Sequence, residues 1–245
     1  MNWYPIFLRE MLLFKKKLFR LGYIFTSMMV PLLYLLAFGL GLGRSVRVTG
    51  GTYINYLLPG LVAMSSMNNS YNWVASGLNL SRLYFKTFQV LVQAPIASTS
   101  IMTGYVLSGM IRGLFASVMI ILVGLVTGSG FSLSLLFLFT LLLNCFLFSN
   151  LGVIVGMITK THEDTSTYAN FFILPMVFFS GTFFPIDRMP SILKYLVLCL
   201  PLTHANILMR QTTLDSRGWI ALAVMVIYAF LFFILGSRMI RNYSE

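Results

Sequence analysis

Long stretches of apolar residues, separated by short polar segments, dominate the pattern along this chain. Continuous apolar runs of about 20 residues predict membrane-spanning helices, because a helix of that length crosses the hydrocarbon core of a bilayer. The runs are too long and too continuous for the alternating strands of an outer-membrane barrel. Residues 1–245 are therefore predicted to form one all-α integral membrane domain. Its six spans are expected at 21–43, 54–78, 99–127, 131–158, 168–186 and 218–237.

The fifth apolar run ends in a segment that a regular helix does not tolerate, Gly181 to Pro190. Pro185 and Pro190 each remove a backbone donor and clash with the preceding turn, so the helix has to break. The next apolar stretch, 191–205, is shorter than a bilayer crossing requires. The pattern predicts an outer re-entrant helical hairpin at 187–205, between spans five and six. The residues expected to shape this outer gate are Gly181, Pro185, Pro190, Pro201 and His204.

Residues 4–20, before the first span, have helical periodicity. Phe7, Met11, Phe14, Leu18 and Leu21 follow one another at spacings of four and three, which places them on one helical face. This pattern predicts an amphipathic interfacial helix with cations toward anionic lipid, the alternative being a simple basic flank of the first span. The cations of this segment are Arg9, Lys15, Lys16, Lys17 and Arg20.

The connection between spans two and three, at about 79–98, is unusually apolar for a loop. Aromatic and aliphatic side chains follow one another there: Tyr84, Phe85, Phe88, Val90, Leu91 and Val92. A segment free in water would not need them. They predict a short helix that docks either on a partner protein or on the bilayer.

The distribution of charge sets the orientation of the chain. Only 9% of the residues are charged, the net charge is +11, and 58% are hydrophobic. A basic balance of this size would suggest nucleic acid for a soluble protein, but in a membrane protein Lys and Arg mark the cytoplasmic side. With both termini inside, more of the cations lie on inner than on outer segments. The pattern predicts cytoplasmic termini and no nucleic-acid partner.

Polar residues within the predicted spans are candidates for function, because they are costly in the bilayer. Arg112 should face the bundle or a cavity, or reach an interface. Asparagines in spans more often join helices, and glycines four apart, such as Gly152 and Gly156, favour close helix packing. No Asp or Glu lies in the predicted spans, which disfavours proton-coupled transport. The asparagines at issue are Asn68, Asn69, Asn144, Asn150 and Asn170.

Catalytic, metal and cofactor sites are not predicted. His162, Glu163 and Asp164 are adjacent but lack metal-ligand spacing, and Asp164 with Thr165 reads as the N-cap of the fifth span. The glycines of 39–43 lack the spacing of a dinucleotide-binding loop. No G-x-x-x-x-G-K-[ST] loop occurs, so ATP would have to be hydrolysed elsewhere. Cys145 and Cys199 are expected to be unpaired.

Several stretches together resemble membrane subunits of ATP-binding-cassette exporters of the type-2 class, which include permeases for Nod factors, O-antigen polysaccharides and antibiotics. The resemblance covers nearly the whole chain. It rests on Phe88-Gln89-Val90-Leu91-Val92-Gln93-Ala94-Pro95-Ile96, Gly104-Tyr105 with Arg112-Gly113, Phe179-Ser180-Gly181-Thr182-Phe183-Phe184-Pro185-Ile186, and Leu200-Pro201-Leu202-Thr203-His204-Ala205 with Arg210.

The resemblance implies a half-transporter of the bacterial inner membrane. Two copies would form the pore, and two copies of a cytoplasmic ATPase, which binds ATP and Mg, would drive an amphipathic substrate outward. That substrate would be a lipid-linked saccharide, a lipid or a drug-like molecule. Relatives often have Gly-Thr-x-Glu in the inner loop, where this chain has Lys86-Thr87-Phe88-Gln89. The implied ATPase-coupling residues are Tyr84, Phe85, Lys86, Thr87, Phe88, Gln89 and Pro95.

Two other classes of protein remain open at this stage. An integral membrane enzyme acting on lipid intermediates would need converging carboxylates, histidines or a nucleophile, and the chain offers only the cluster at 162–164. A passive channel or a structural subunit would also be compatible with a docking helix on the cytoplasmic side.

Overall fold

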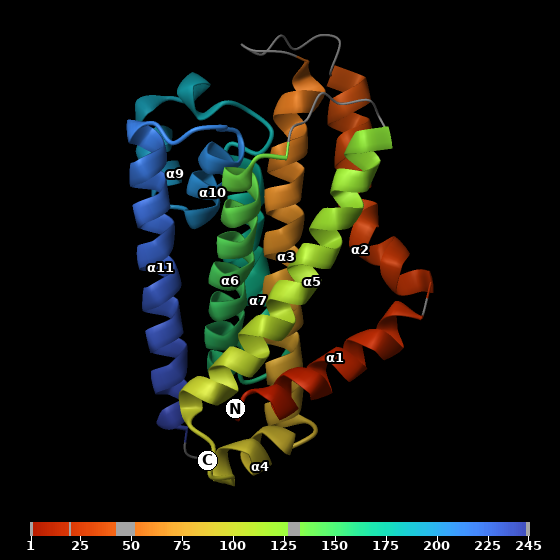
Figure 1. Ribbon diagram of the computed structural model, residues 1–245, viewed down its shortest axis with the longest axis vertical. Helices are drawn as coiled ribbons and strands as arrows, with labels where there is room; N and C mark the ends of the chain where they lie inside the picture. The colour runs from red at the N-terminus through yellow and green to blue at the C-terminus, as the bar shows by residue number, and fades with distance from the viewer. Residues whose placement is uncertain (1, 20, 43–51, 127–132, 244–245) are drawn as a thin grey trace.

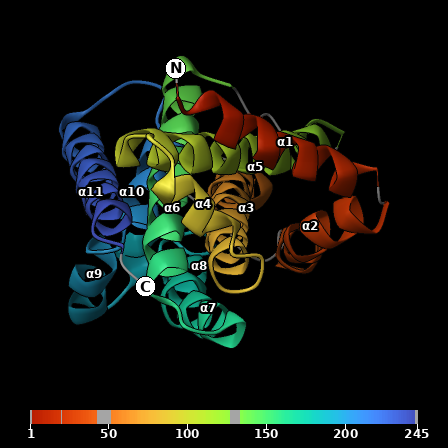
Figure 2. The same cartoon turned by 90° about the horizontal axis from the view of Figure 1, so that it is seen from below.

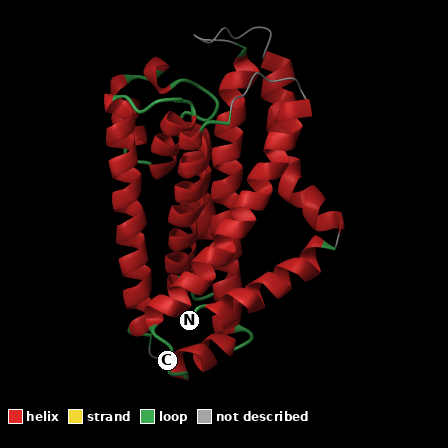
Figure 3. Ribbon diagram, viewed as in Figure 1, coloured by secondary structure: helices red, strands yellow, loops and turns green. Residues whose placement is uncertain are grey.

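Helices make up nearly all of the computed structural model, which describes residues 2–19, 21–42, 52–126 and 133–243. No strand occurs in these ranges (Figure 3), so the all-α prediction is confirmed for them. Most helices run along the long axis of the molecule. The start of α1 and the end of α11 lie at the same end (Figure 1).

Within the described ranges, three helices are long and apolar enough to cross a membrane: α5 (Ser98–Val126), α6 (Leu135–Ile158) and α11 (Ser216–Arg241). They correspond to predicted spans three, four and six. The side chain of Ser134 accepts a hydrogen bond from the backbone N–H of Phe137, and that of Asp215 accepts one from Gly218. These N-caps satisfy orphan donors of the first turn and fix where α6 and α11 begin. The helix of the predicted fourth span, α6, therefore begins at Leu135, and not at the predicted residue 131.

The centre of the bundle is α3 (Tyr53–Leu83), which packs mainly against α5 and α6. Gly152 and Gly156 permit this approach, since a Cβ on either would come within 2.9 Å of an α3 carbonyl oxygen. α3 continues five residues beyond the predicted end of span two, residue 78. Because it carries many polar residues, it does not belong to the three most apolar helices.

The first and fifth predicted spans are composed of successive helical segments. α2 (Leu21–Tyr34) continues into the π-helix η1 (Leu35–Leu42). The fifth consists of α7 (His162–Tyr168), the π-helix η2 (Ala169–Ile173) and α8 (Leu174–Phe179).

The boundaries predicted for the fifth span, 168–186, were wrong at both ends. Thr161 and Asp164 form a capping box, so the helix begins at His162, and Thr161 is the N-cap instead of Asp164 or Thr165. It ends at Phe179, because Gly181 adopts a left-handed conformation with φ of +75°.

Beyond this break, the 3₁₀-helix η3 (Ile186–Arg188) leads to α9 (Ser191–Leu198) and α10 (Pro201–Met209). The axes of α9 and α10 meet at 93°. The predicted helical pair is thus present, although it ends at Met209 instead of residue 205. α10 packs against α3, α6 and α11, whereas most of α9 is not buried.

α1 (Tyr4–Leu18) lies obliquely across α5, and the short helix α4 (Thr87–Gln93) closes the same end of the bundle (Figures 1 and 2). The buried stripe of α1 is Ile6, Glu10 and Phe14. The predicted apolar face lies beside this stripe and overlaps it: Phe14 is buried, and Phe7, Met11 and Leu18 are half-buried. Ile6 decides the register, because it packs on Gly104 of α5. Arg20 and the side chain of Leu21 lie outside the described residues.

Candidate functional site

Polar side chains gather at three levels of this apolar bundle. We name them after the orientation that the sequence predicts: the inner junction, where α1 meets α4; the central cavity, beside α3; and the outer latch, around the helix break after α8. Two of the three contain a buried arginine.

At the inner junction, the backbone bends so that some side chains of the predicted coupling segment are exposed and others are buried. Tyr84 and Phe85 are each 70% exposed, whereas Phe88 is fully buried and contacts Tyr243 edge-on at 5.2 Å between ring centroids. Lys86, in a left-handed conformation with φ of 52°, separates the two sets. Pro95 is also exposed. Phe88 is thus unavailable to a partner, while Tyr84 and Phe85 form an exposed aromatic tip.

Hydrogen bonds hold α4 in place. The guanidinium of Arg9 in α1 donates to the hydroxyl of Thr87 at 3.1 Å, and the Gln89 amide donates to the carbonyl of Arg82 at 2.9 Å. Arg82 in turn donates to the carbonyls of Met157 and Thr159 at the end of α6. A displacement of α4 would therefore strain or break hydrogen bonds that connect it with α1 and α3, and through Arg82 with α6.

Glu10 is a buried carboxylate that the sequence reasoning missed. Its side chain is only 3% exposed, and the charges of Arg9, Arg112 and Lys17 act on it. Burial is the largest effect and raises the pKa of Glu10, while these cations oppose the rise. The signal was the four-residue spacing of Ile6, Glu10 and Phe14, which the alternative apolar face obscured.

Arg112 is 2% exposed and lies deep in the bundle, as predicted for an arginine within a span. Its guanidinium stacks on the ring of Trp73 and lies 4.1 Å from the ring centroid of Phe14. The ammonium group of Lys17 also lies over Trp73, 4.7 Å from its centroid. These cation–π contacts connect α1, α3 and α5 around one indole.

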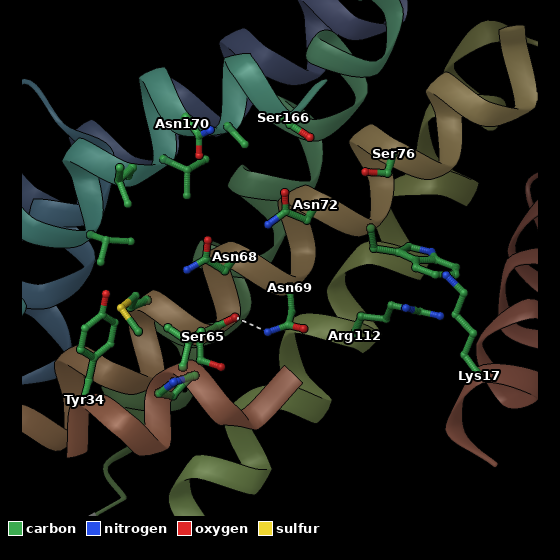
Figure 4. A pocket seen from close by; sticks show the side chains of 18 residues that line it. Lys17, Tyr34, Ser65, Asn68, Asn69, Asn72, Ser76, Arg112, Ser166 and Asn170 are labelled. Atoms are coloured by element: carbon green, nitrogen blue, oxygen red, sulfur yellow. Dashed lines mark hydrogen bonds between the residues drawn. The ribbon is translucent and has the colours of Figure 1, made fainter. Parts of the chain in front are cut away.

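The central cavity has a volume of about 620 Å³ and opens between α2, α3 and the α7–η2–α8 segment. One face of α3 supplies most of its polar wall, because Ser65, Asn68, Asn69, Asn72 and Ser76 recur at helical spacing. Asn170 and Ser166 face them from the opposite wall (Figure 4). Lys17 and Arg112 lie at one side of the cavity.

The other intramembrane asparagines lie elsewhere. Asn144 donates to the carbonyl of Ala63 at 3.1 Å and to the hydroxyl of Ser66 at 2.8 Å, which joins α6 to α3. Asn150 donates to the carbonyl of Phe146 in its own helix. Neither lines the central cavity. Of the four predicted intramembrane polar residues, Arg112 and Asn170 line the cavity from different sides, whereas Asn144 contributes to packing.

The outer latch is a set of hydrogen bonds that holds the helix break after α8 in place. Arg210 of α10 donates to the carbonyls of Tyr56 at 3.2 Å and Thr182 at 3.3 Å, and its guanidinium stacks 3.9 Å from the ring centroid of Tyr56. The hydroxyl of Tyr56 donates to the carbonyl of Gly181 at 2.7 Å. Asn206 adds bonds to Ser180 and Thr182. The break is thereby tied to both α3 and α10.

The predicted gate residues surround this latch. Pro185 and Pro190 line a second cavity of about 600 Å³, whose wall is rich in phenylalanine. Pro201 begins α10, and a ring nitrogen of His204 lies 2.8 Å from the carbonyl oxygen of Leu198, which closes the bend between α9 and α10. Gly181 packs on Ile186, since a Cβ would come within 2.7 Å of that side chain.

No group of three or more His, Cys, Asp or Glu side chains that could hold a metal ion occurs in the described part of the chain. Glu163 is exposed, and Asp164 caps α7. The carboxylate of Asp164 accepts hydrogen bonds from the backbone N–H groups of Lys160 and Thr161, so it is occupied in capping the helix.

Comparison with known proteins identifies relatives along most of the chain. Residues 6–214 match the model of the ABC-2 type transporter family. The inner membrane transport permease YadH of Escherichia coli (strain K12) is 30% identical over 182 residues, or 71% of each chain. Nodulation protein J of Rhizobium meliloti (strain 1021) is 28% identical over 98% of this chain and 93% of its own. That of Rhizobium leguminosarum bv. viciae is 26% identical over 99% and 95%.

Proposed function

The chain belongs to the ABC-2 type transporter family, and from this premise we propose that it is the permease half of an ATP-driven exporter of the bacterial inner membrane. Like its relatives, it is a transport permease subunit and not an enzyme. A separate cytoplasmic ATPase would bind ATP and Mg and drive the transport. The exposed aromatic tip of Tyr84 and Phe85 carries this proposal most directly.

The proposed coupling surface combines an exposed tip with a rigid support. Tyr84 and Phe85 are large apolar side chains that water alone would not favour. The same segment is bound to α1 through Thr87 and to the core through Phe88. A partner that pushes on the tip would therefore move the bundle, which is what coupling between two conformations requires.

The proposed number of spans is six, if α2 with η1, α3 and α7–η2–α8 are counted together with the three apolar helices. α2 with η1 contains 22 residues, α3 contains 31, and α7–η2–α8 runs from His162 to Phe179. At 1.5 Å per residue, the first two reach the roughly 30 Å of hydrocarbon, and the third falls just short of it. Both termini would then be cytoplasmic, with α9 and α10 as a re-entrant hairpin on the outer side.

A second copy of the chain would complete the pathway. The central cavity opens on the side where α2 and the α7–η2–α8 segment are separated, and polar α3 residues lie in that opening (Figure 4). Carboxamides at membrane depth are unfavourable toward lipid. Two chains related by a two-fold axis would place these faces toward each other around a shared path. The phenylalanine-lined outer cavity and the latch would close its outer end.

Co-purification from membranes tests the proposal. We expect the tagged chain, extracted in mild detergent, to give a complex of two permeases and two ATPase subunits by native mass spectrometry. The double variant Tyr84→Ser/Phe85→Ser should lose the ATPase but keep the permease dimer. The exposed residues Leu12→Ser and Leu13→Ser serve as a matched control and should retain it. Recovery of the parent chain without any ATPase, from native membranes in which the ATPase is also present, would contradict the proposal.

A further inference from the structure

The central cavity has a wall of unusual chemistry for a membrane protein. Four carboxamides and three serine hydroxyls line it: Asn68, Asn69, Asn72, Asn170, Ser65, Ser76 and Ser166. Carboxamides both donate and accept hydrogen bonds, as do hydroxyls. Such a wall matches a ligand that carries several neutral hydroxyl or amide groups.

Three of these carboxamides are not used by the protein itself. Asn69 donates to the carbonyl of Ser65 at 3.0 Å, but within the described residues the side chains of Asn68, Asn72 and Asn170 have no protein hydrogen-bond partner. Asn144, by contrast, makes two bonds to α3. A polar group at this depth is costly unless water or a ligand satisfies it. The three free amides therefore point to a wet, ligand-accepting surface.

The same cavity has a cationic side. Lys17 and Arg112 line it, and no Asp or Glu is among the described residues of its wall. Behind that wall, Glu10 faces Arg9 and Lys17 as well as Arg112. Three cations thus act on one carboxylate, so the net charge of these four side chains is positive and attracts an anionic group. An ammonium and a guanidinium are the usual partners of phosphate oxygens.

We propose that the central cavity is a subsite for a polyol phosphate head group, with hydroxyls on the asparagine wall of α3 and the phosphate at Lys17 and Arg112. The inference rests on the proposed transport function and narrows its substrate class. Apolar residues of α2 and α8, such as Val30 and Leu174, border the same cavity and would accompany the attached hydrocarbon chain. Polyol phosphates occur both in phospholipids and in lipid-linked saccharides, which share this chemistry.

Trp73 supplies a reporter inside the site. It is one of three tryptophans in the chain, it lines the cavity, and both Lys17 and Arg112 lie over its ring. A phosphate that binds these cations will change the surroundings of the indole. Trp3→Phe/Trp219→Phe leaves Trp73 as the single tryptophan. Its fluorescence then measures binding to the purified permease without any ATPase.

A panel of short-chain probes separates the two halves of the head group. Dioctanoyl phosphatidylinositol has the polyol and the phosphate, dioctanoyl phosphatidic acid lacks the polyol, octyl glucoside lacks the phosphate, and dioctanoyl phosphatidylcholine carries choline in place of the polyol. We expect the first to bind at least about tenfold more tightly than the other three, since each missing group removes one or more hydrogen bonds. Farnesyl phosphoryl glucose tests the saccharide source; tighter binding than phosphatidylinositol would assign the site to lipid-linked saccharides.

Variants locate the effect. Lys17→Gln should weaken phosphatidylinositol about tenfold, whereas Lys16→Gln, one residue away but outside the cavity, should leave it unchanged. Asn68→Ala and Asn72→Ala should reduce the preference for phosphatidylinositol over phosphatidic acid, with Asn242→Ala as the control.

Equal binding of all probes by the parent protein, or none, would overturn the inference whether or not a variant folds. It would also be overturned if Lys16→Gln and Lys17→Gln had equal effects. Because this assay needs no ATPase, a negative result leaves the proposed coupling to stand or fall separately.

Discussion

Two charged side chains of the bundle, Glu10 and Arg210, have surroundings that determine how a substitution there affects stability. Glu10 lies among three cations at the inner junction, and Arg210 lies among backbone carbonyls at the outer latch. Glu10 is buried and Arg210 is half-buried, so that their hydrogen bonds and charges are less screened than at the surface. Substitutions at these two positions therefore test the structure residue by residue.

Glu10→Gln should alter the pH dependence of stability. Burial raises the pKa of Glu10 in the folded protein above its ordinary value of 4.5, so the folded state binds this proton more tightly than the unfolded state. The protonated Glu10 side chain therefore stabilises the folded state fully below pH 4.5. This stabilisation is lost as the pH rises through the raised pKa of the folded protein. Thermal unfolding in detergent should show this loss between those values in the parent protein, and it should be absent in Glu10→Gln. Identical pH profiles would contradict the assigned burial.

Arg210→Gln should destabilise the outer latch. Replacing a guanidinium that serves several carbonyls leaves buried acceptors unsatisfied, which costs about 1.5–3 kcal/mol. A lower melting temperature for Arg210→Gln than for the exposed Arg217→Gln is the expected result. Equal melting temperatures would show that the latch does not hold the break.

The sequence could predict that Arg112 lies inside the bundle, but it could not predict that Glu10 is buried. A charge in the middle of an apolar run is visible without a structure, since its cost is evident. Glu10 lies in a segment with two competing apolar faces, and only packing of Ile6 on Gly104 decided between them. The unpartnered asparagines, likewise, are distinguished from Asn144 only by what lies opposite each side chain.

At the scale of helices, packing is fixed by small residues where α3 meets α6. Gly156 leaves room for the Ala75 carbonyl oxygen, which a Cβ would meet at 2.9 Å, whereas a Cβ at Gly41 would meet nothing within 4 Å. Gly156 lies four residues from Gly152, a spacing that favours close helix packing, whereas Gly41 has no glycine four residues away.

Alanine substitutions should therefore have opposite effects at these glycines. Gly156→Ala should destabilise the protein by about 1–3 kcal/mol through overpacking. Gly41→Ala should be neutral or stabilise by up to about 1 kcal/mol, because alanine favours helix. Thermal unfolding of the two variants measures the difference. A Gly156→Ala protein as stable as the parent would contradict the close α3–α6 contact.

Helix boundaries illustrate what the sequence determines at this scale. Apolar length alone predicted α5, α6 and α11. The fifth segment was misplaced because its ends depend on a capping box at Thr161 and a left-handed Gly181, which are local hydrogen-bond and backbone features. The helix break before α9 was predicted from prolines, but the extension of α10 to Met209 follows from its burial against other helices.

At the scale of the whole molecule, the proposed orientation places α4 inside the cell and the η3 turn outside. Gln93 and Asp187 are exposed at these two ends. In a Cys145→Ala/Cys199→Ser background, a membrane-impermeant maleimide added to intact cells should label Asp187→Cys but not Gln93→Cys. Inverted vesicles should give the reverse. Labelling of Gln93→Cys in intact cells would contradict the orientation.

In the proposed mechanism, binding of ATP to the partner subunit moves the walls of the central cavity. Spin labels at Asn170→Cys, in the same cysteine-free background, would report the distance between the two copies of the purified permease–ATPase complex. We predict that a non-hydrolysable ATP analogue shifts this distance distribution, and that Tyr84→Ser/Phe85→Ser abolishes the shift. An unchanged distribution in a complex with active ATPase would contradict the account.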